Sequence, residues 1–293
     1  MTITTLTATP RLGRLTHGEG PLWDPTQGVL NYVDINGHRI HRYWPESDRE
    51  QVVNIGREVC DIHHTSSGRL LVAVREGVAL GDLESGLSTI AAPLADSPDI
   101  RTNDGNVDPA GRYYIGTMAY DFGPGRAVLY RLEDGVCLPV LEGLTISNGI
   151  DWAPDGRMFF IDSPTGLVEC FDYDLASGDF SNRRSFAEID ADLGIPDGMT
   201  IDRDGGVWVA VFGGGQVRRY TPDGELDMIV EVPGARKVTA CAFGGSDFGD
   251  LYITTSLVDL TAAELREQPD AGRLHQVRPG CFGKPATPYP DEP

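Results

Sequence analysis

The sequence has few positively charged residues for its length. Its 293 residues include 24 Lys and Arg against 44 Asp and Glu, which gives a formal net charge of −20. Nucleic acids and anionic membranes are bound through Lys and Arg side chains, so this balance argues against both as partners. We therefore expect the ligand to be a small neutral molecule or a cation.

Long apolar segments and paired cysteines are also missing. The longest unbroken apolar run, residues 207–212, is far shorter than the roughly 20 residues of a membrane-spanning helix. Residues 1–19 contain no apolar core of a signal peptide. The chain has five scattered cysteines and no CxxC pair: Cys60, Cys137, Cys170, Cys241 and Cys281. These absences predict a cytoplasmic protein with free thiols.

Short apolar segments that follow a turn glycine recur along the chain. The repeat glycines are Gly28, Gly68, Gly111, Gly156, Gly205 and Gly249, with separations of 40, 43, 45, 49 and 44 residues. A period in the forties with β-type sequence is typical of four-stranded propeller blades. We therefore predict an all-β, six-bladed β-propeller in which residues 1–293 form a single domain with a metal site at the mouth of the central channel.

Two further features concern the ends of this ring. Helical periodicity is confined to residues 260–268, which predicts one or two helical turns there. Because each blade packs only on its neighbours, the chain ends must close the ring. We expect residues 11–15 to add a strand beside residues 273–277.

Aligning the repeats brings a set of polar residues into register. The positions eight residues before a repeat glycine hold Cys60, Asn103, Asn148, Asp197 and Cys241, and Glu19 stands nine residues before Gly28. The innermost strand of a blade begins near one mouth of the channel, so equivalent positions should converge on the axis. Four of the six carry side-chain oxygens.

Two carboxylates and one or two amides that meet on an axis need a partner. Like charges repel in a low-dielectric site, and a divalent cation would relieve that repulsion. Oxygen donors from Glu, Asn and Asp suit hard cations such as Ca²⁺, Mg²⁺ or Mn²⁺ better than Zn²⁺. The alternative interpretation is that Asn148-Gly149 and Asp197-Gly198 are merely turn dipeptides.

Several short motifs resemble one known family. They include residues 18–23 (GEGPLW), 101–105 (RTNDG), 116–118 (GTM), 147–149 (SNG) and 196–199 (PDGM), and their order spans nearly the whole chain. The sequence resembles the senescence marker protein, regucalcin and gluconolactonase family of six-bladed propellers. The resemblance implies a lactonase that opens sugar aldonolactones with one divalent metal ion, for which we expect Ca²⁺, with Zn²⁺, Mn²⁺, Mg²⁺ or Fe²⁺ as alternatives.

The resemblance also assigns residues. The matching motifs make Glu19, Asn148 and Asp197 the metal ligands, and they make Arg101 and Asn103 the substrate-binding residues. The loop after Gly116-Thr117-Met118 looks shorter than in vertebrate members of the family. In this loop Asp121 is the candidate to replace the substrate-contacting glutamate of those members.

For the mechanism, we hypothesise that Asp197 takes a proton from the attacking water. A structural salt bridge is the alternative role for Arg101, and His17 is either a donor to Glu19 or a packed loop residue. A different hydrolase activity on other esters or organophosphate triesters, or a non-enzymatic calcium-binding regulator, remains the alternative function. The sequence does not determine the oligomeric state.

Overall fold

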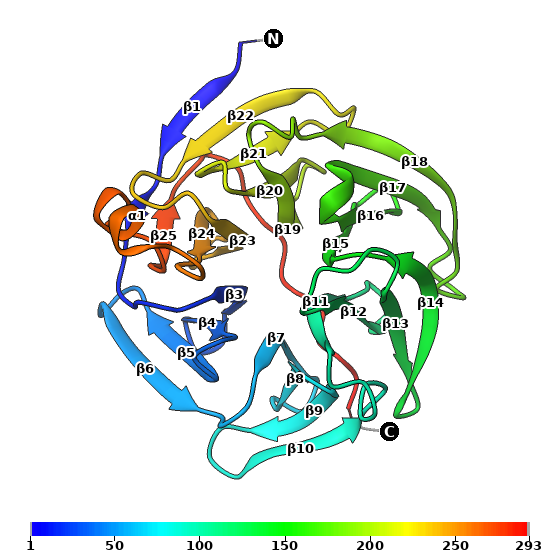
Figure 1. The fold of residues 1–293 in the computed structure, drawn as a ribbon. Coiled ribbons are helices and arrows are strands. Elements are labelled where there is room, and N and C mark those ends of the chain that lie inside the picture. The colour runs from blue at the N-terminus through cyan, green and yellow to red at the C-terminus, as the bar shows by residue number, and fades with distance from the viewer. Residues whose placement is uncertain (1, 292–293) are drawn as a thin grey trace.

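Each repeat of the sequence folds into one sheet, and the six sheets surround a central channel (Figure 1). This computed structural model describes residues 2–291. The repeat glycines lie in the turns between the first two strands of a blade, where Gly28 and Gly111 have φ angles of 60° and 92°. Glycine tolerates such left-handed backbone without a Cβ clash. The prediction of an all-β, six-bladed propeller is confirmed.

The first three blades follow the chain order without exchange of strands. Blade 1 contains β3 (Gly18–Asp24), β4 (Val29–Asp34), β5 (Arg39–Trp44) and β6 (Arg49–Asn54). Blade 2 contains β7 (Val59–His64), β8 (Leu70–Val74), β9 (Gly77–Asp82) and β10 (Gly86–Ala91). Blade 3 contains β11 (Ile100–Val107), β12 (Tyr113–Ala119), β13 (Ala127–Glu133) and β14 (Val136–Leu144).

The last three blades also run from the channel outward, and two of them receive a strand from the N-terminus. Blade 4 contains β15 (Ser147–Trp152), β16 (Arg157–Asp162), β17 (Leu167–Tyr173) and β18 (Phe180–Glu188), with the 3₁₀ turn η1 (Ser163–Thr165) after β16. Blade 5 contains β19 (Ile195–Ile201), β20 (Val207–Phe212), β21 (Gln216–Tyr220), β22 (Leu226–Glu231) and β1 (Thr4–Thr7). Blade 6 contains β23 (Val238–Gly244), β24 (Asp250–Thr255), β25 (His275–Val277) and β2 (Thr9–Pro10).

The N-terminal segment closes the ring, but the closing strand lies a few residues before the expected range of 11–15. The closing strand is β2, which pairs antiparallel with β25, while β1 runs parallel to β22 of blade 5. Residues 11–15 form no strand; they contact the last blade through single backbone bonds, such as the 2.6 Å bond from the Arg11 N–H to the Leu274 carbonyl. The prediction was wrong by a few residues because Gly13, at φ 83°, bends the chain there.

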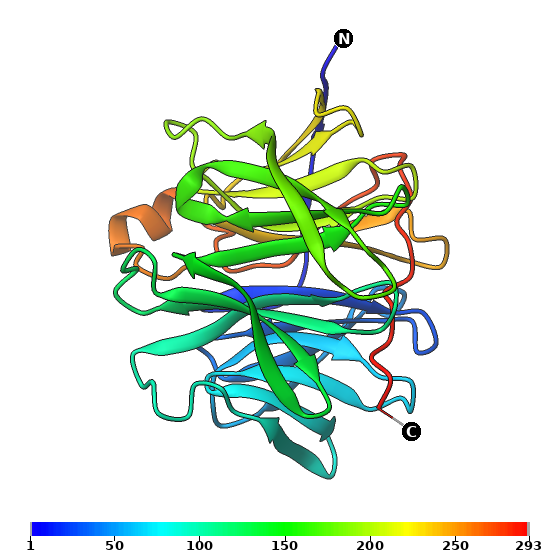
Figure 2. The same ribbon diagram turned by 90° about the vertical axis from the view of Figure 1, so that its right-hand side faces the viewer.

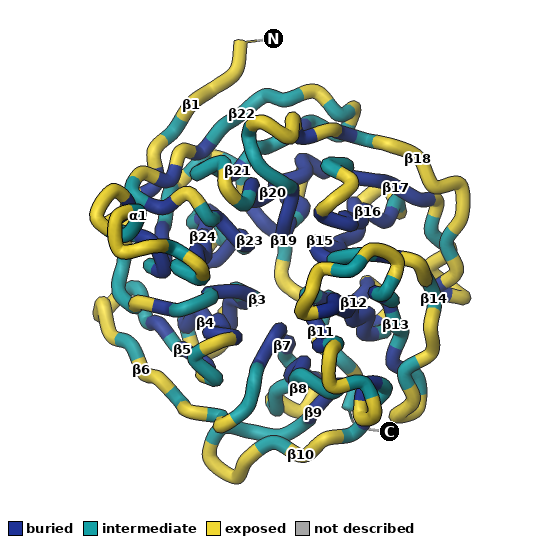
Figure 3. The backbone as a smooth tube through the Cα atoms, viewed as in Figure 1, coloured by how far each residue is buried: buried dark blue, intermediate teal, exposed yellow. Residues whose placement is uncertain are grey.

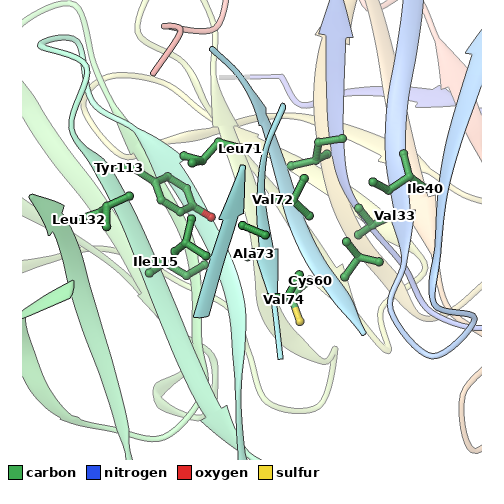
Figure 4. Packing of buried hydrophobic residues seen from close by; sticks show 14 of the residues in the cluster. Val33, Ile40, Cys60, Leu71, Val72, Ala73, Val74, Tyr113, Ile115 and Leu132 are labelled. Carbon is green, nitrogen blue, oxygen red and sulfur yellow. The ribbon is translucent and has the colours of Figure 1, made fainter. Parts of the chain in front are cut away.

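The core lies between neighbouring blades. Figure 3 shows that the inner strands are buried while the outermost strands are largely exposed. In the cluster of Figure 4, Val72 of blade 2 lies on the side of Val33 and Ile40 of blade 1, and the next residue, Ala73, lies on the side of Ile115 of blade 3. Such contacts fix the rotation of each blade against the next, and so fix the positions of the inner strands around the axis.

Buried tryptophans and a short helix also belong to the fold. Trp23, Trp152 and Trp208 are buried between blades, with 7%, 2% and 0% of their surface exposed. The helix α1 (Ala262–Glu267) lies within the expected range and begins with a capping box between Thr261 and Glu264.

In residues 2–291, no helix has the length and apolar character needed to span a membrane. All five cysteines are free, and only Cys137 and Cys281 are partly exposed.

The C-terminal segment was not anticipated. After β25 the chain runs across one end of the channel, on the side of the ring opposite α1 (Figures 1 and 2). It bonds to blade 6 through the Gly283 N–H and the Phe248 carbonyl, at 2.8 Å, and to blade 2 through the Tyr289 N–H and the His64 carbonyl, at 2.9 Å. We call residues 280–291 the C-terminal strap.

Candidate active site

The innermost strand of each blade is irregular where it passes the channel. In all six the pairing with the second strand shifts register, at Glu19/Leu22, Val59/Asp61, Thr102/Gly105, Asn148/Ile150, Pro196/Met199 and Val238/Cys241. A β-bulge re-aims the side chains at that point. The repeat positions that the sequence aligned therefore lie at equivalent bulges around one axis.

Glycines beside the bulges allow the inner strands to approach one another. A Cβ on Gly149 would lie 2.9 Å from the Asp197 carbonyl oxygen, and a Cβ on Gly198 would lie 2.7 Å from the Ala240 Cβ. Asn148-Gly149 and Asp197-Gly198 stand inside β15 and β19. The turn-dipeptide interpretation is therefore wrong for both, because these glycines serve close packing.

Five of the predicted site residues line one cavity of about 260 Å³. They are Glu19, Arg101, Asn103, Asn148 and Asp197, each between 6% and 8% exposed. All five stand near the first residues of β3, β11, β15 and β19, so the cavity lies at the channel end where the inner strands begin. We call it the axial cavity.

A chain of hydrogen bonds orders the amides of this cavity. Arg101 Nη1 donates to Asn103 Oδ1 at 2.7 Å, and Asn103 Nδ2 donates to Asn148 Oδ1 at 2.8 Å. Asn148 Nδ2 donates to Ser163 Oγ at 2.7 Å. An amide oxygen has two lone pairs, so Asn148 Oδ1 can accept this bond and still face a second partner.

Glu19 and Asp197 are both buried, and the negative charge of Asp197 acts on Glu19. Burial raises the pKa of Glu19 well above its usual range, and the charges of Asp197 and then Asp104 raise it further. Burial likewise raises the pKa of Asp197, again assisted by Asp104. Among residues 2–291 neither carboxylate forms an ion pair with Lys or Arg, and Glu19 approaches only His17 Nε2, at 4.0 Å. Two such carboxylates fit a bound cation.

The donors present restrict how a cation could be held. In the described part of the chain, no three His, Cys, Asp or Glu side chains gather in a way that could hold a metal ion. A cation here would therefore need the Asn148 amide oxygen beside Glu19 and Asp197, together with water. This all-oxygen set matches hard divalent cations.

Arg101 and His17 have partners that bear on their alternative roles. Arg101 pairs with no carboxylate in the described range; it donates to Asn103 and to the Thr102 carbonyl at 2.8 Å. His17 lines the axial cavity, and its Nδ1 lies 2.8 Å from Ser256 Oγ. Burial lowers the pKa of His17 to about 3, so it is neutral.

Asp121 is the predicted site residue that the structure does not bring to the cavity. Its side chain is 65% exposed and accepts a hydrogen bond from Arg126 Nη1 at 2.8 Å. Arg126 also binds Asp99, so ion pairs hold both ends of the loop 120–126. The aromatic neighbours Tyr120 and Phe122 line the cavity instead.

Sequence reasoning missed several residues of the axial cavity, including Glu58, Ser163, Phe212 and Lys237. Ser163 directly follows β16, and its contact with Asn148 could have been suspected from the hairpin that joins β15 to β16. Glu58 and Lys237 each come directly before an inner strand, so the repeat alignment contained their signal a few residues upstream of the aligned positions Cys60 and Cys241.

The opposite end of the channel holds a second cavity of about 230 Å³, which we call the rear chamber. Asp61, His63 and Asp104 line it, and Lys284 of the C-terminal strap donates to Asp151 Oδ1 at 2.9 Å on its wall. The strap thus covers this end of the channel. The axial cavity remains the end that contains the predicted ligands.

Comparison with known proteins places this geometry in a family. Residues 17–257 match the model of the SMP-30/Gluconolactonase/LRE-like region. Regucalcin of Danio rerio is 39% identical over 277 residues, which are 93% of each chain. A putative sugar lactone lactonase, YvrE, of Bacillus subtilis is 37% identical over 93% of this chain and 94% of its own.

Solved structures agree with the sequence relatives. A crystal structure of regucalcin from Agrobacterium tumefaciens, described as a calcium-binding protein, superposes with a TM-score of 0.92 at 26% identity, covering 98% of this chain and 99% of that one. A luciferin-regenerating enzyme gives a TM-score of 0.88 at 29% identity, over 97% and 99% of the two chains.

Proposed function

Because the chain belongs to the SMP-30/gluconolactonase/LRE-like family, we propose that it hydrolyses sugar aldonolactones to aldonic acids. The observation that carries the proposal is the convergence of Glu19, Asn148 and Asp197 with Arg101 and Asn103 in one buried cavity. Ester hydrolysis needs a group that stabilises an oxyanion, a proton acceptor and groups that hold the substrate. These five residues are suited to supply or support all three.

A divalent cation would be held by Glu19, Asn148 and Asp197, with Ca²⁺ as the expected ion. The buried carboxylates, which pair with no Lys or Arg in residues 2–291, support this assignment, as does the description of the Agrobacterium relative as calcium-binding. When bound, such a cation polarises the lactone carbonyl, stabilises the oxyanion and keeps Asp197 ionised.

Side chains of the protein transfer the proton of the attacking water and hold the sugar. Asp197 accepts a proton from the water that attacks the lactone carbonyl carbon; the bond from that carbon to the ring oxygen then breaks, and the proton passes to the ring oxygen. Arg101 uses one N–H on Asn103, which leaves further N–H groups for sugar hydroxyls. Asn103 keeps the guanidinium and the Asn148 amide in register.

Acid release from D-glucono-, D-xylono- and D-galactonolactone tests the proposal, with Asp197→Ala as the measure of spontaneous opening. The expected result is hydrolysis of at least one lactone, and a kcat about 10²–10⁴-fold lower in Asp197→Asn. Asp179→Asn, which changes an aspartate with an 81% exposed side chain, is the matched control and should behave as the wild type.

Three outcomes would contradict parts of this account. Hydrolysis of a phosphotriester but of no lactone would favour the other hydrolase activity. Calcium binding by folded protein without hydrolysis of either would favour a regulator. Asp197→Asn with more than about a tenth of the wild-type kcat would remove Asp197 from the role of base.

A further inference from the structure

The apolar residues of the axial cavity gather on three neighbouring blades, which also carry Arg101, Asn103, Asn148 and Asp197. Above the metal-ligand positions, blades 6, 1 and 2 contribute mainly polar residues, namely His17, Asn36, Glu58, Lys237 and Asp259. Blades 3, 4 and 5 contribute Met118, Phe122, Ile146, Ile195 and Phe212. The three apolar blades are consecutive around the ring in Figure 1. We call this second group the apolar wall; Val258 of blade 6 is an apolar residue outside it.

Four of the five residues of the apolar wall stand opposite each other in pairs. Met118 and Ile146 face each other in a β-bridge that joins blades 3 and 4. Ile195 and Phe212 are directly paired in the first two strands of blade 5. Phe122 stands at the rim, where 58% of its surface is exposed at a φ of 56°. A bulky residue holds such a backbone conformation only when its surroundings impose it, so the backbone of Phe122 is held at the mouth.

The polar atoms near the apolar wall are already bonded within the protein. Ser163 Oγ accepts from Asn148, and Asn103 Nδ2 donates both to Asn148 and to the Ser147 carbonyl at 2.8 Å. The Tyr120 hydroxyl donates to Glu58, on the opposite side of the cavity. A substrate hydroxyl placed against the wall would lose its water and find few partners, whereas a methyl group would lose nothing.

The size of the cavity decides how much of a sugar lactone meets the wall. At about 260 Å³ it lies just below the usual range of ligand pockets, so it encloses a monosaccharide-sized molecule rather than part of a longer one. When the carbonyl group faces Asp197 and the ring hydroxyls face Arg101, the last carbon of a six-carbon lactone lies towards the mouth, where the apolar wall carries Phe122.

We propose that the preferred substrates are deoxy-sugar aldonolactones, whose terminal carbon is a methyl group that packs on the apolar wall. This inference rests on the proposed lactone hydrolysis and narrows it to a class of substrate. A hydrophobic pocket rejects an added hydroxyl by up to about 100-fold. The preference over the matching hydroxylated lactone is therefore expected to be about 10- to 100-fold in kcat/KM.

The test compares two pairs of lactones that differ only in the hydroxyl on carbon 6. These are L-fucono- against L-galactono-1,4-lactone, and L-rhamnono- against L-mannono-1,4-lactone. The proposal predicts a higher kcat/KM, by about ten-fold or more, for the deoxy member of at least one pair. Equal values, or a preference for the hydroxylated member in both pairs, would overturn it.

A variant then locates the preference. Ile195→Thr puts a hydroxyl into the apolar wall, so the ratio of kcat/KM within the preferred pair should fall several-fold. Ile229→Thr makes the same change on β22, outside the axial cavity, and should leave the ratio unchanged. A ratio that both variants retain would overturn the assignment to the wall.

The failure of this inference is distinguishable from the failure of the proposed function. Hydrolysis of both members of each pair at equal efficiency contradicts the deoxy-sugar preference and leaves the lactonase activity intact. If no lactone is hydrolysed by protein that unfolds cooperatively, the lactonase activity itself is contradicted, and the inference falls with it.

Discussion

The orientation of the Asn148 amide depends on two hydrogen bonds of opposite sense. Its oxygen accepts from Asn103 at 2.8 Å and its nitrogen donates to Ser163 Oγ at 2.7 Å. If the amide were turned over, two N–H groups would face each other at Asn103 and the donor to Ser163 would be lost. Ser163 therefore acts through Asn148 as a positioning residue for the proposed cation.

Ser163→Ala should weaken the binding of Ca²⁺ about 10- to 100-fold, because a residue that orients a metal ligand typically contributes that much. Isothermal titration calorimetry with Ca²⁺ measures the effect. Ser185→Ala, which changes an exposed serine of β18, is the matched control and should bind as the wild type does. Equal affinity in Ser163→Ala would show that the amide needs no such support.

Substitution of Asp121 and substitution of Arg101 should have very different effects on the kinetics of lactone hydrolysis. Asp121 binds Arg126 outside the axial cavity, so Asp121→Ala should change kcat/KM for D-gluconolactone less than about two-fold, within the small effects expected of surface residues. Arg101→Ala removes the guanidinium from the cavity and should raise KM at least about ten-fold. Steady-state kinetics on both variants decide this, and a large loss in Asp121→Ala would mean that the loop moves over the substrate.

The sequence predicted the site residues that recur at equivalent positions of the repeat. It did not predict the position of a residue whose orientation depends on a loop contact. Glu19, Asn148 and Asp197 could be found because equivalent positions of a propeller face one axis, whatever the blades contain. Asp121 could not be placed, because its direction depends on the ion pair with Arg126 rather than on any period. Ser163 was not identified either, although the hairpin that joins β15 to β16 contained a signal for its contact with Asn148.

At the scale of elements, the strand pair β2 and β25 joins the two ends of the chain. His275 of β25 has no exposed surface, and its Nδ1 lies 3.1 Å from the Arg273 carbonyl oxygen, while its Nε2 has no partner among residues 2–291. Burial lowers the pKa of this imidazole to about 4. The folded protein therefore holds His275 neutral, whereas the unfolded chain protonates it near its ordinary pKa of about 6.5.

Stability should decrease as the pH falls through this interval. Below about pH 6.5 the unfolded state binds a proton that the folded state takes up only near pH 4, so the contribution of His275 is complete above pH 6.5 and is lost progressively towards pH 4. Between about pH 7.5 and pH 5 the loss is of the order of 2 kcal/mol in the free energy of unfolding.

Urea unfolding of the wild type and of His275→Gln at both pH values isolates this contribution. The difference in unfolding free energy between the two proteins should shrink by about 2 kcal/mol at the lower pH. His38→Asn, which alters a partly exposed histidine of blade 1, should retain the wild-type dependence. The same difference at both pH values would contradict the assignment to His275.

The pairing of these end strands was only partly predictable. Ring closure itself follows from the repeat, because the first and the last of six blades must be joined. The register does not, since Thr9–Pro10 has little strand pattern of its own and pairs where Gly13 and the turn before His275 leave room. The parallel pairing of β1 with β22 had no sequence signal, as β1 is short and largely exposed.

For the molecule as a whole, the C-terminal strap connects blades that are not neighbours. It bonds to Phe248, to the Arg203 N–H through the Phe282 carbonyl at 2.8 Å, to Asp151 through Lys284, and to His64. These partners belong to blades 6, 5, 4 and 2. The strap therefore holds the ring together at the end of the channel opposite the axial cavity.

Truncation after Arg278 should lower the free energy of unfolding by at least about 2 kcal/mol, because several backbone hydrogen bonds are lost and Asp151 loses its cationic partner. Denaturant unfolding measures this loss. No described residue of the strap lines the axial cavity, so kcat for D-gluconolactone should stay within about two-fold under native conditions. Unchanged stability would contradict the bracing role.

The central claim is that the axial cavity hydrolyses lactones with a divalent cation at Glu19, Asn148 and Asp197. The most direct measurement is the initial rate of acid release from D-gluconolactone by protein treated with EDTA, before and after Ca²⁺, Mg²⁺, Mn²⁺ or Zn²⁺ is added, with Asp197→Ala as background. The account predicts that EDTA reduces the rate to background and that at least one ion restores it. A rate above background that survives complete removal of metal would contradict it.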